Sequence, residues 1–269
     1  MAMSDVKPSK RPRYYRRSKK RRSKFDRERV RIAAVEVLRV MKRSYSYEEL
    51  SSMTGLPVTV LSRYVNGHVL PSFDRASEIL DLFGEKFLVK AVKDKIRIDE
   101  RRVFDHTGVL SDMVLLSMVA KIALREFWEE EITKVLTKET AGIPLAVLVG
   151  RELGVDVLIA RDKKSMAVKR FIEARRVFSD GTYAYMYLPR GLMGEKDNIL
   201  IVDDCIRTGS AVRALAEMCK MAKASLKGVF VIIEVGDSSS RIEAELAKMF
   251  PPKCPVKALV KLPLPPPSA

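Results

Sequence analysis

The feature that most constrains the fold is a regular alternation of apolar strand patterns and amphipathic helix patterns in the second half of the chain. The apolar runs are continuous, which is typical of strands that are buried on both faces. Such strands, separated by helices, form parallel sheets covered on both sides. We therefore expect an α/β domain over residues 108–262 with a doubly wound parallel sheet. The expected strands are 131–137, 155–160, two strands within 175–188, 198–204, 227–235 and 256–262, and the expected helices are 142–153, 210–222 and 240–250.

The residues before this domain predict an all-α module over 25–84. Apolar residues recur with the helical period from residue 30 to residue 41, and three shorter helices follow between glycine and proline signals. Ser46 and Glu49 have the spacing of a capping box. The expected helix starts are Ser46, Pro57 and Ser72, and the expected helix ends are Gly55, Gly67 and Gly84.

Two of these helices, joined by a tight glycine turn, resemble the helix-turn-helix of phage-repressor-like proteins. The apolar positions between the two helices are filled by Leu50, Leu56, Leu61 and Tyr64. The resemblance implies that the outward face of the second helix enters the major groove of double-stranded DNA. A helical hairpin that only packs against its neighbour is the alternative. The residues expected to contact DNA are Pro57, Val58, Thr59, Ser62, Arg63 and Asn66.

Positive charge is concentrated in the first 24 residues. They hold eleven lysines and arginines against one aspartate, a net +10 out of +16 for the whole chain. A segment with so few apolar residues predicts a disordered arm over 1–24. Beside a DNA-binding module such an arm is expected to bind phosphates, with a solubilising tail as the alternative. The arm residues expected to contact DNA are Arg16, Arg17, Lys19, Lys20, Arg21 and Arg22.

Two further segments complete the expected organisation. Residues 85–107 read as a connector, in which His106 is given no role, and residues 263–269 read as a proline-rich tail. Neither a signal peptide nor a transmembrane run is recognisable, so we expect a soluble, cytoplasmic, nucleoid-associated protein. The absence of glutamine and the 31% content of charged residues are typical of thermophile proteins. The three cysteines, Cys205, Cys219 and Cys254, fit no metal-binding spacing.

The stretch NILIVDDCIRTGSA (198–211) places two acids at the end of an apolar strand, directly before a small-residue turn and a helix. In a doubly wound sheet, ligands bind beyond the carboxyl ends of the strands. Backbone N–H groups at the turn favour an anion, whereas carboxylates suit hydroxyl groups or a divalent cation. The combination predicts a sugar 5-phosphate, with its hydroxyls on Asp203 and Asp204; a purely structural strand end is the alternative. The expected phosphate residues are Arg207, Thr208, Gly209, Ser210 and Ala211.

This stretch resembles the phosphoribosyl-pyrophosphate motif of the type I phosphoribosyltransferase family. In that motif an apolar strand is followed by two acids, two variable residues, Thr-Gly and small residues. Ser210 and Ala211 depart from the usual Gly-Thr, which removes one hydroxyl group but no backbone donor. The resemblance implies phosphoribosyl pyrophosphate or a related nucleotide or sugar phosphate as ligand, with Mg²⁺ held through it near Asp203 and Asp204.

Two other segments resemble parts of the same family. TKETAGIPLA resembles its pyrophosphate loop, and LIARDKK resembles the strand end that carries a basic residue near the pyrophosphate. The resemblance assigns the basic role at that strand end to Arg161, with Lys163 as the alternative. The pyrophosphate-loop residues it implies are Lys138, Thr140, Ala141 and Gly142.

The order of the two modules is similar to that of phosphoribosyltransferase-like transcriptional regulators of archaea and bacteria. No orotate-type signature and no base-reading residue are recognisable, so no catalytic residue is assigned. Residues 162–180 read as the flexible loop of the family. We expect a homodimeric DNA-binding regulator that senses the phosphorylated ligand. The alternatives are an active purine or pyrimidine phosphoribosyltransferase with a nucleic-acid anchor, and a protein that binds RNA or ribosomes through its arm.

Overall fold

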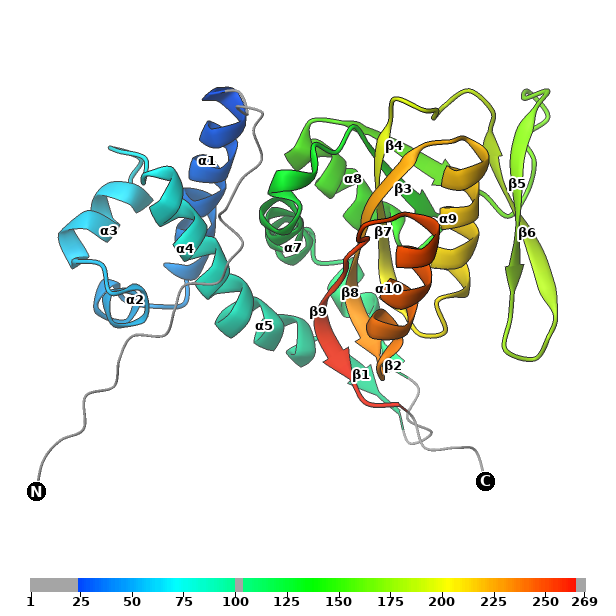
Figure 1. Ribbon diagram of the computed structural model, residues 1–269. Helices are drawn as coiled ribbons and strands as arrows, with labels where there is room; N and C mark the ends of the chain where they lie inside the picture. The colour runs from blue at the N-terminus through cyan, green and yellow to red at the C-terminus, as the bar shows by residue number, and fades with distance from the viewer. Residues whose placement is uncertain (1–23, 100–103, 265–269) are drawn as a thin grey trace, which may run out of the picture.

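The computed structural model describes residues 24–99 and 104–264, so most of the predicted basic arm, including its DNA-contact residues, and the end of the proline-rich tail lie outside the described residues. The first domain is helical, as predicted (Figure 1). Ser46 and Glu49 form both hydrogen bonds of the capping box. Leu50, Leu56 and Leu61 are buried between the helices, and Tyr64 is half-buried. The elements are α1 (Lys24–Met41), α2 (Tyr47–Thr54), α3 (Val58–Val65) and α4 (Phe73–Phe83).

The helix predicted to close at Gly84 continues past it, so this predicted helix end is wrong. Gly84 has helical angles, and a π-helical turn, η2 (Gly84–Leu88), leads directly into α5 (Val89–Asp94). Leu88 and Val92 are both fully buried, so the apolar face of α4 extends beyond the glycine. Tertiary packing therefore outweighs the weak helix propensity of Gly84.

The connector carries a short hairpin that leads into a helix against the sheet. β1 (Arg97–Ile98) and β2 (Phe104–Asp105) pair in antiparallel fashion. α6 (Thr107–Leu110), α7 (Met113–Glu126) and η3 (Trp128–Glu130) follow. In α7 the residues Leu115–Leu124 are mostly buried, because this helix lies between the helical domain and the sheet (Figure 1).

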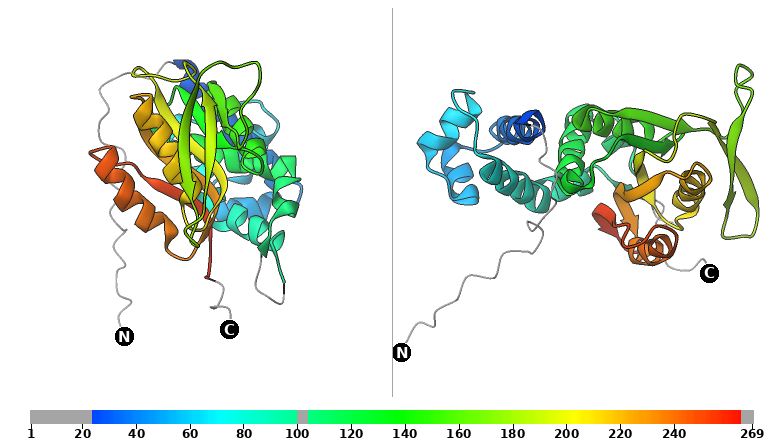
Figure 2. Two further views of the ribbon diagram at one scale, coloured as in Figure 1. Left: turned by 90° about the vertical axis from the view of Figure 1, so that its right-hand side faces the viewer. Right: turned by 45° about the horizontal axis from the view of Figure 1, so that its top comes forward.

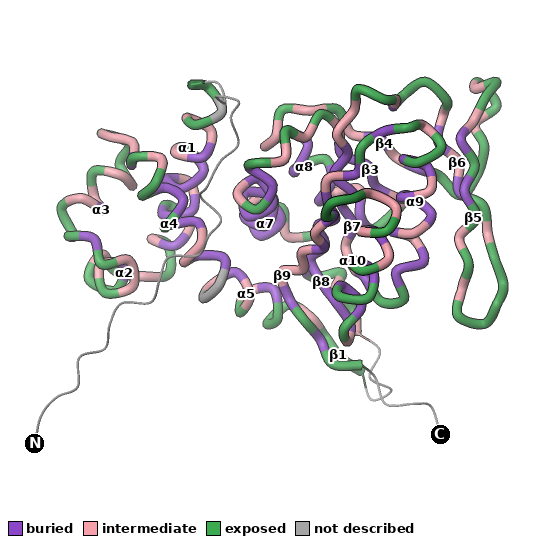
Figure 3. The backbone as a smooth tube through the Cα atoms, viewed as in Figure 1, coloured by how far each residue is buried: buried purple, intermediate pink, exposed green. Residues whose placement is uncertain are grey.

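The second domain is a parallel five-stranded sheet with the order β4-β3-β7-β8-β9, which confirms the predicted α/β class. Side chains on successive residues of a strand point to opposite faces. Leu200 and Val202 accordingly pack on the side of α7 and α8, whereas Ile199 and Ile201 pack on the side of α9 and α10. The central strands β7 and β8 are mostly buried (Figure 3). The bounds are β3 (Lys134–Lys138), α8 (Ile143–Leu153), β4 (Asp156–Ala160), β7 (Asn198–Ile206), α9 (Ser210–Met221), β8 (Ser225–Val235), α10 (Ser238–Met249) and β9 (Val256–Leu262).

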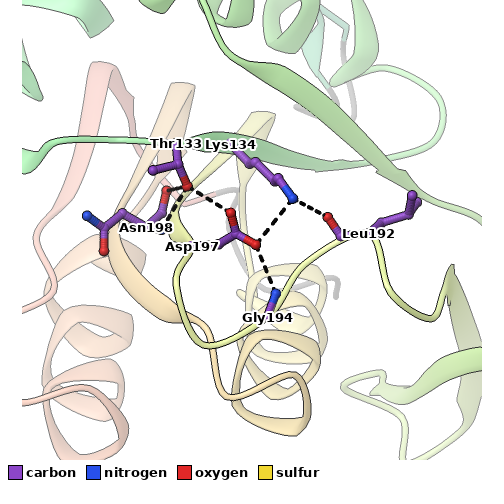
Figure 4. Close-up of polar contacts among 6 residues, drawn as sticks. All are labelled: Thr133, Lys134, Leu192, Gly194, Asp197 and Asn198. Carbon is purple, nitrogen blue, oxygen red and sulfur yellow. Dashed lines mark hydrogen bonds and ion pairs between the residues drawn. The ribbon is translucent and has the colours of Figure 1, made fainter.

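The strands β3 and β7 are joined at one end and separate at the other. At their amino ends, Asp197 accepts hydrogen bonds from Thr133 Oγ1 (3.1 Å), Lys134 Nζ (3.2 Å) and the backbone of Gly194 (2.9 Å), as Figure 4 shows. Pairing of β3 with β7 stops at Ile201, although β7 continues beside β8 to Ile206, two residues beyond its predicted end. A gap therefore opens between β3 and β7 at their carboxyl ends.

An antiparallel hairpin of β5 (Phe171–Val177) and β6 (Tyr183–Pro189) lies beside α9, on the side of the molecule away from the helical domain (Figures 1 and 2). Ile172, Ala174, Met186 and Leu188 form its buried face. The prediction of a loop over 162–180 is therefore wrong over Phe171–Val177, which form β5. The buried Ile172 and Ala174 of β5, which pack with Met186 and Leu188 of β6, outweigh the charges between them.

The two domains share one apolar core and a buried ion-pair cluster. Lys121 of α7 is 3% exposed at its side chain, and its Nζ lies 2.6 Å from Glu36 Oε2 of α1 and 2.9 Å from Glu152 Oε1 of α8. Arg125 of α7 contacts Asp81 of α4 at 2.9 Å. Among the residues that the structure describes, no helix has the length and apolar character needed to cross a membrane.

Candidate ligand site and DNA-binding surface

The predicted ligand residues meet where the strand order reverses. In chain order, the sheet runs 2-1-3-4-5, and the reversal lies between β3 and β7. Ligands of open α/β sheets bind at the carboxyl side of such a point. The loop after β3 and the aspartate pair of β7 border the same gap, so two predicted motifs that are far apart in the sequence share one site.

Gly142 brings the loop after β3 into contact with the aspartate pair. A Cβ atom on Gly142 would lie 2.4 Å from Asp203 Oδ1 and 2.6 Å from Thr137 Oγ1, so the position has room only for glycine. The neighbouring Thr140 and Ala141 are exposed. The carboxylate of Asp203 therefore faces the predicted pyrophosphate loop directly.

Asp203 and Asp204 differ in burial and in ionisation. Burial, and then the charge of Asp204, raise the pKa of Asp203 well above the usual carboxyl value. Burial also raises the pKa of Asp204, but hydrogen bonds with His106 and Asp203 outweigh it and leave the pKa lowered. Asp204 is thus the firmly ionised member of the pair. Burial raises the pKa of the adjacent Cys205 to about 12, which keeps this thiol protonated at neutral pH.

The turn after β7 leads into the N-terminus of α9, which begins at Ser210 as predicted. Gly209 has φ +76°, and a Cβ atom there would lie 2.2 Å from Ile242 Cδ1, so this position also requires glycine. Arg207 and Thr208 are exposed, and Ala211 is half-buried. The predicted phosphate residues therefore form a compact turn at a helix N-terminus, where anions are favoured.

Three arginines that the sequence analysis missed surround this turn. Arg176 of β5 donates from Nε to Ser210 Oγ at 3.1 Å. Arg213 Nη1 and Arg241 Nη2 donate to the carbonyl oxygen of Thr208 at 2.8 and 3.3 Å. They come from a hairpin and two helices, and no local pattern links those segments to the turn. Arg213 is also paired with Glu245, with Nε 2.5 Å from Oε2 and Nη2 2.9 Å from Oε1, so its charge is largely balanced. Arg176 and Arg241 add positive charge beside the turn.

Both basic residues predicted to face pyrophosphate are paired with acids. Lys138 Nζ lies 3.4 Å from Asp162 Oδ2, and Arg161 Nε lies 3.4 Å from Glu139 Oε2. Glu139 Oε1 also accepts a hydrogen bond from the backbone N–H of Asp162 at 2.7 Å. The alternative residue, Lys163, is exposed.

The connector also reaches the site, which the sequence analysis did not foresee. His106 Nε2 lies 2.5 Å from Asp204 Oδ2, a contact between residues 98 positions apart. The guanidinium of Arg207 lies over the ring of Phe104, 4.9 Å from its centroid. Figure 1 shows β1 and β2 at the arrowhead end of the sheet. The sequence around His106 carries no signal of this contact.

The face of α3 that was predicted to read DNA points away from the helical core. Ser62 is half-buried and accepts a hydrogen bond from Asn66 Nδ2 at 3.2 Å. Arg63 is exposed in the last turn of the helix. The other predicted contact residues, Pro57, Val58, Thr59 and Asn66, are all exposed.

Comparison with known proteins supports both halves of this architecture. Residues 36–89 match a family model described as helix-turn-helix. The adenine phosphoribosyltransferase of Rhodothermus marinus superposes with a TM-score of 0.56 at 24% identity, over 65% of this chain and 98% of that one. The enzyme of Thermoanaerobacter pseudethanolicus superposes with a TM-score of 0.57 at 16% identity, over 65% and 99%. The chain joins a helix-turn-helix domain to a phosphoribosyltransferase-fold domain.

Curated relatives match less than half of this chain and only part of their own length. A xanthine phosphoribosyltransferase of Bacillus cereus is 34% identical over 125 residues, which are 46% of this chain and 64% of the relative. One from Bacillus thuringiensis is 35% identical with the same coverage. The chain thus spans slightly less than two thirds of these relatives.

The phosphoribosyltransferase-fold domain offers part of a Mg²⁺ site. Over residues 24–99 and 104–264, no three His, Cys, Asp or Glu side chains gather to hold a metal ion. Asp203 and Asp204 supply carboxylate oxygens, which Mg²⁺ prefers, and Mg²⁺ commonly takes its other ligands from bound phosphates and water. The space that a Cβ atom of residue 142 would fill lies directly beside Asp203. The residues therefore fit Mg²⁺ as an ion brought in with a phosphorylated ligand.

Proposed function

We propose that this chain is a DNA-binding transcriptional regulator whose phosphoribosyltransferase-fold domain senses phosphoribosyl pyrophosphate or a related nucleotide or sugar phosphate. The observation that carries the proposal is the joining of two surfaces on domains that share one apolar core. The outward face of α3 presents polar side chains and Arg63. The carboxyl end of β7 carries two acids and a small-residue turn that three arginines contact.

Each group in the site has a role that follows from its chemistry. The turn from Arg207 to Ala211, with Arg176 beside it, binds the 5-phosphate through N–H groups, hydroxyls and positive charge. Asp203 and Asp204 accept hydrogen bonds from the sugar hydroxyls. The loop Lys138–Gly142 and Arg161 bind the pyrophosphate, and Mg²⁺, when bound with the ligand, neutralises part of the phosphate charge.

DNA recognition combines contacts that read the base sequence with phosphate contacts that position the protein on the duplex. Arg63, Ser62 and Asn66 on α3 would contact base edges and phosphates in the major groove. The basic arm would add phosphate contacts that are independent of sequence. Operators with two half-sites need two reading heads, so the proposal includes a homodimer. A coupling free energy of about 1–3 kcal/mol between ligand and DNA gives a switch of about 5–150-fold in DNA affinity.

The DNA half of the proposal is tested with duplexes selected from a random pool and measured by fluorescence anisotropy. Arg63→Ala should weaken binding about 5–150-fold, the effect of about 1–3 kcal/mol, and reduce its salt dependence. Arg190→Ala, an exposed arginine after β6, is the matched control and should bind as the wild type does. Equal binding by both variants at every salt concentration would remove α3 as the reading element.

The ligand half is tested by thermal shift and calorimetry with phosphoribosyl pyrophosphate, nucleoside monophosphates and ribose 5-phosphate, each with Mg²⁺. We expect phosphoribosyl pyrophosphate to stabilise the wild type. Asp203→Asn combined with Asp204→Asn should abolish this response and leave basal DNA affinity almost unchanged. A wild-type protein that binds none of these compounds contradicts the proposal.

An active phosphoribosyltransferase with a nucleic-acid anchor is the second candidate. It is favoured by the xanthine phosphoribosyltransferases among the relatives. The segments predicted to bind the phosphates are those that such an enzyme would also need. Incubation with each purine or pyrimidine base, phosphoribosyl pyrophosphate and Mg²⁺ decides between the two. Nucleotide product at a rate above the Asp203→Asn, Asp204→Asn control would establish transferase activity.

A further inference from the structure

The contact between His106 and Asp204 joins the connector to the candidate ligand site. Nε2 of the imidazole lies 2.5 Å from Asp204 Oδ2, and the two side chains are only 19% and 14% exposed. Phe104, two residues earlier, lies under Arg207 of the phosphate turn. One face of the site is thus closed by residues that belong to the linkage between the domains.

His106 is hydrogen-bonded to Asp204, a carboxylate that the proposed function assigns to the sugar hydroxyls of the ligand. Asp203 is buried and its Oδ1 already accepts the backbone N–H of Asp204 at 3.0 Å. The accessible carboxylate of the pair is therefore Asp204, and His106 is bound to its Oδ2. A sugar hydroxyl and the imidazole would compete for the same partner.

A continuous set of contacts leads from His106 to the DNA-binding module. The carbonyl oxygen of His106 accepts hydrogen bonds from the first turns of α6, at the N–H groups of Val109 (2.9 Å) and Leu110 (3.1 Å). A Cβ atom at Gly108 would lie 3.1 Å from the carbonyl oxygen of Lys95, so α6 packs directly on the end of α5. Lys95 Nζ also lies 3.1 Å from Asp112 Oδ2, which caps α7.

The other end of this route is the recognition module itself. α5 is continuous with α4 through η2, and α4 packs along α1 and touches α7. A displacement of His106 therefore acts on α6 and, through α6, on the end of α5. Because α5 continues α4, this movement reaches the helix-turn-helix domain. This is a physical connection between two sites through packed elements, which is what coupling requires.

We propose that His106 is a latch on Asp204, which the sugar hydroxyls of the ligand displace, so that the connector and α4–α5 report whether the site is filled. The latch rests on the proposed function, because it names how that same site is read. Without ligand the connector is held on the sheet. With ligand, Asp204 is bound to the sugar and the connector is released.

The latch predicts that His106→Ala strengthens ligand binding but weakens the effect of the ligand on DNA affinity. His106→Ala should bind phosphoribosyl pyrophosphate with Mg²⁺ about tenfold more tightly, because the ligand no longer displaces a hydrogen bond to an ionised group. The ligand-induced change in DNA affinity should fall to less than about twofold, because without the latch the DNA affinity in the absence of ligand should already lie near that of the liganded wild type. Ser111→Ala, which removes only the hydrogen bond from the exposed Ser111 Oγ to the carbonyl oxygen of Thr107, is the matched control and should behave as the wild type.

Histidine NMR gives a readout that does not depend on mutation. The chain contains only two histidines, His68 and His106, so the ring resonances of His68 serve as an internal reference in the full-length protein. Addition of phosphoribosyl pyrophosphate with Mg²⁺ should shift the ring resonances of His106 and leave those of His68 in place.

The outcomes separate the latch from the function on which it rests. A wild-type protein that binds no ligand and shows no ligand effect on DNA overturns both. A wild-type protein that responds, with a His106→Ala variant that binds and responds equally, overturns only the latch. Weaker ligand binding by His106→Ala also overturns it, because the imidazole would then be a ligand contact.

Discussion

Replacement of Lys121 by methionine measures how strongly the buried ion-pair cluster holds the two domains together. Methionine keeps the length of the apolar stem and removes the charge. Glu152, 15% exposed at its side chain, then loses its cation, whereas Glu36, 45% exposed, can turn to water. The cost of the substitution is therefore the burial of one unpaired carboxylate.

The magnitude follows from this difference in exposure. Removal of one member of a buried ion pair costs about 3–5 kcal/mol, and a half-exposed pair contributes less than about 1 kcal/mol. We expect a loss near the lower bound, about 3 kcal/mol, because the Glu36 contact is screened by solvent. At about 2–4 °C per kcal/mol, the melting temperature should fall by about 6–12 °C. The expected order of destabilisation is Lys121→Met, then Glu152→Gln, then Glu36→Gln.

Differential scanning calorimetry of the full chain measures the effect. Because the cluster spans α1, α7 and α8, its loss should also separate the unfolding of the helical domain from that of the sheet domain, which appears as a second transition. Lys220→Met, at an exposed position of α9, is the control and should leave the melting temperature unchanged. An unchanged melting temperature for Lys121→Met, or an equal loss for Glu36→Gln and Glu152→Gln, refutes the reasoning.

The site and the helix caps allow three further predictions. Asp203→Asn should abolish ligand binding and raise the melting temperature at neutral pH, because the raised pKa of Asp203 means that its ionised form opposes folding. The gain in melting temperature should vanish as the pH falls below the ordinary carboxyl range, and the exposed Asp94→Asn is the control. Gly142→Ala should cost about 1–3 kcal/mol and weaken ligand binding, whereas Gly194→Ala, with nothing within 4 Å of its Cβ, should do neither; urea denaturation and calorimetry compare the two. Ser46→Ala should lower stability by about 0.5–2 kcal/mol in urea denaturation, and retention of full stability would show that the cap contributes nothing.

The parts of the fold that were predictable from the sequence are those with a local signal. The apolar runs around Ile199 and Val229 identify strands, and the small-residue turn before Ser210 identifies the start of α9. The capping box at Ser46 likewise needs only residues three positions apart. These signals also placed the aspartate pair at the carboxyl end of the sheet.

The missed features depend on contacts between distant segments. Gly84 signals a helix end locally, but the buried Leu88 and Val92 continue the helix. Arg176 reaches the phosphate turn only because β5 packs on α9, and His106 reaches Asp204 only because the connector folds back on the sheet. No spacing within the sequence encodes either contact.

The helical run from Phe73 to Asp94, which includes the π-helical turn η2, is roughly 30 Å long at about 1.5 Å per residue. A tilt of this run about its Asp94 end would move the opposite end by about 0.5 Å for each degree, as simple leverage over that length requires. A change of a few degrees in direction at the connector would thus shift the start of α4, which follows α3 in the chain, by about an ångström or more.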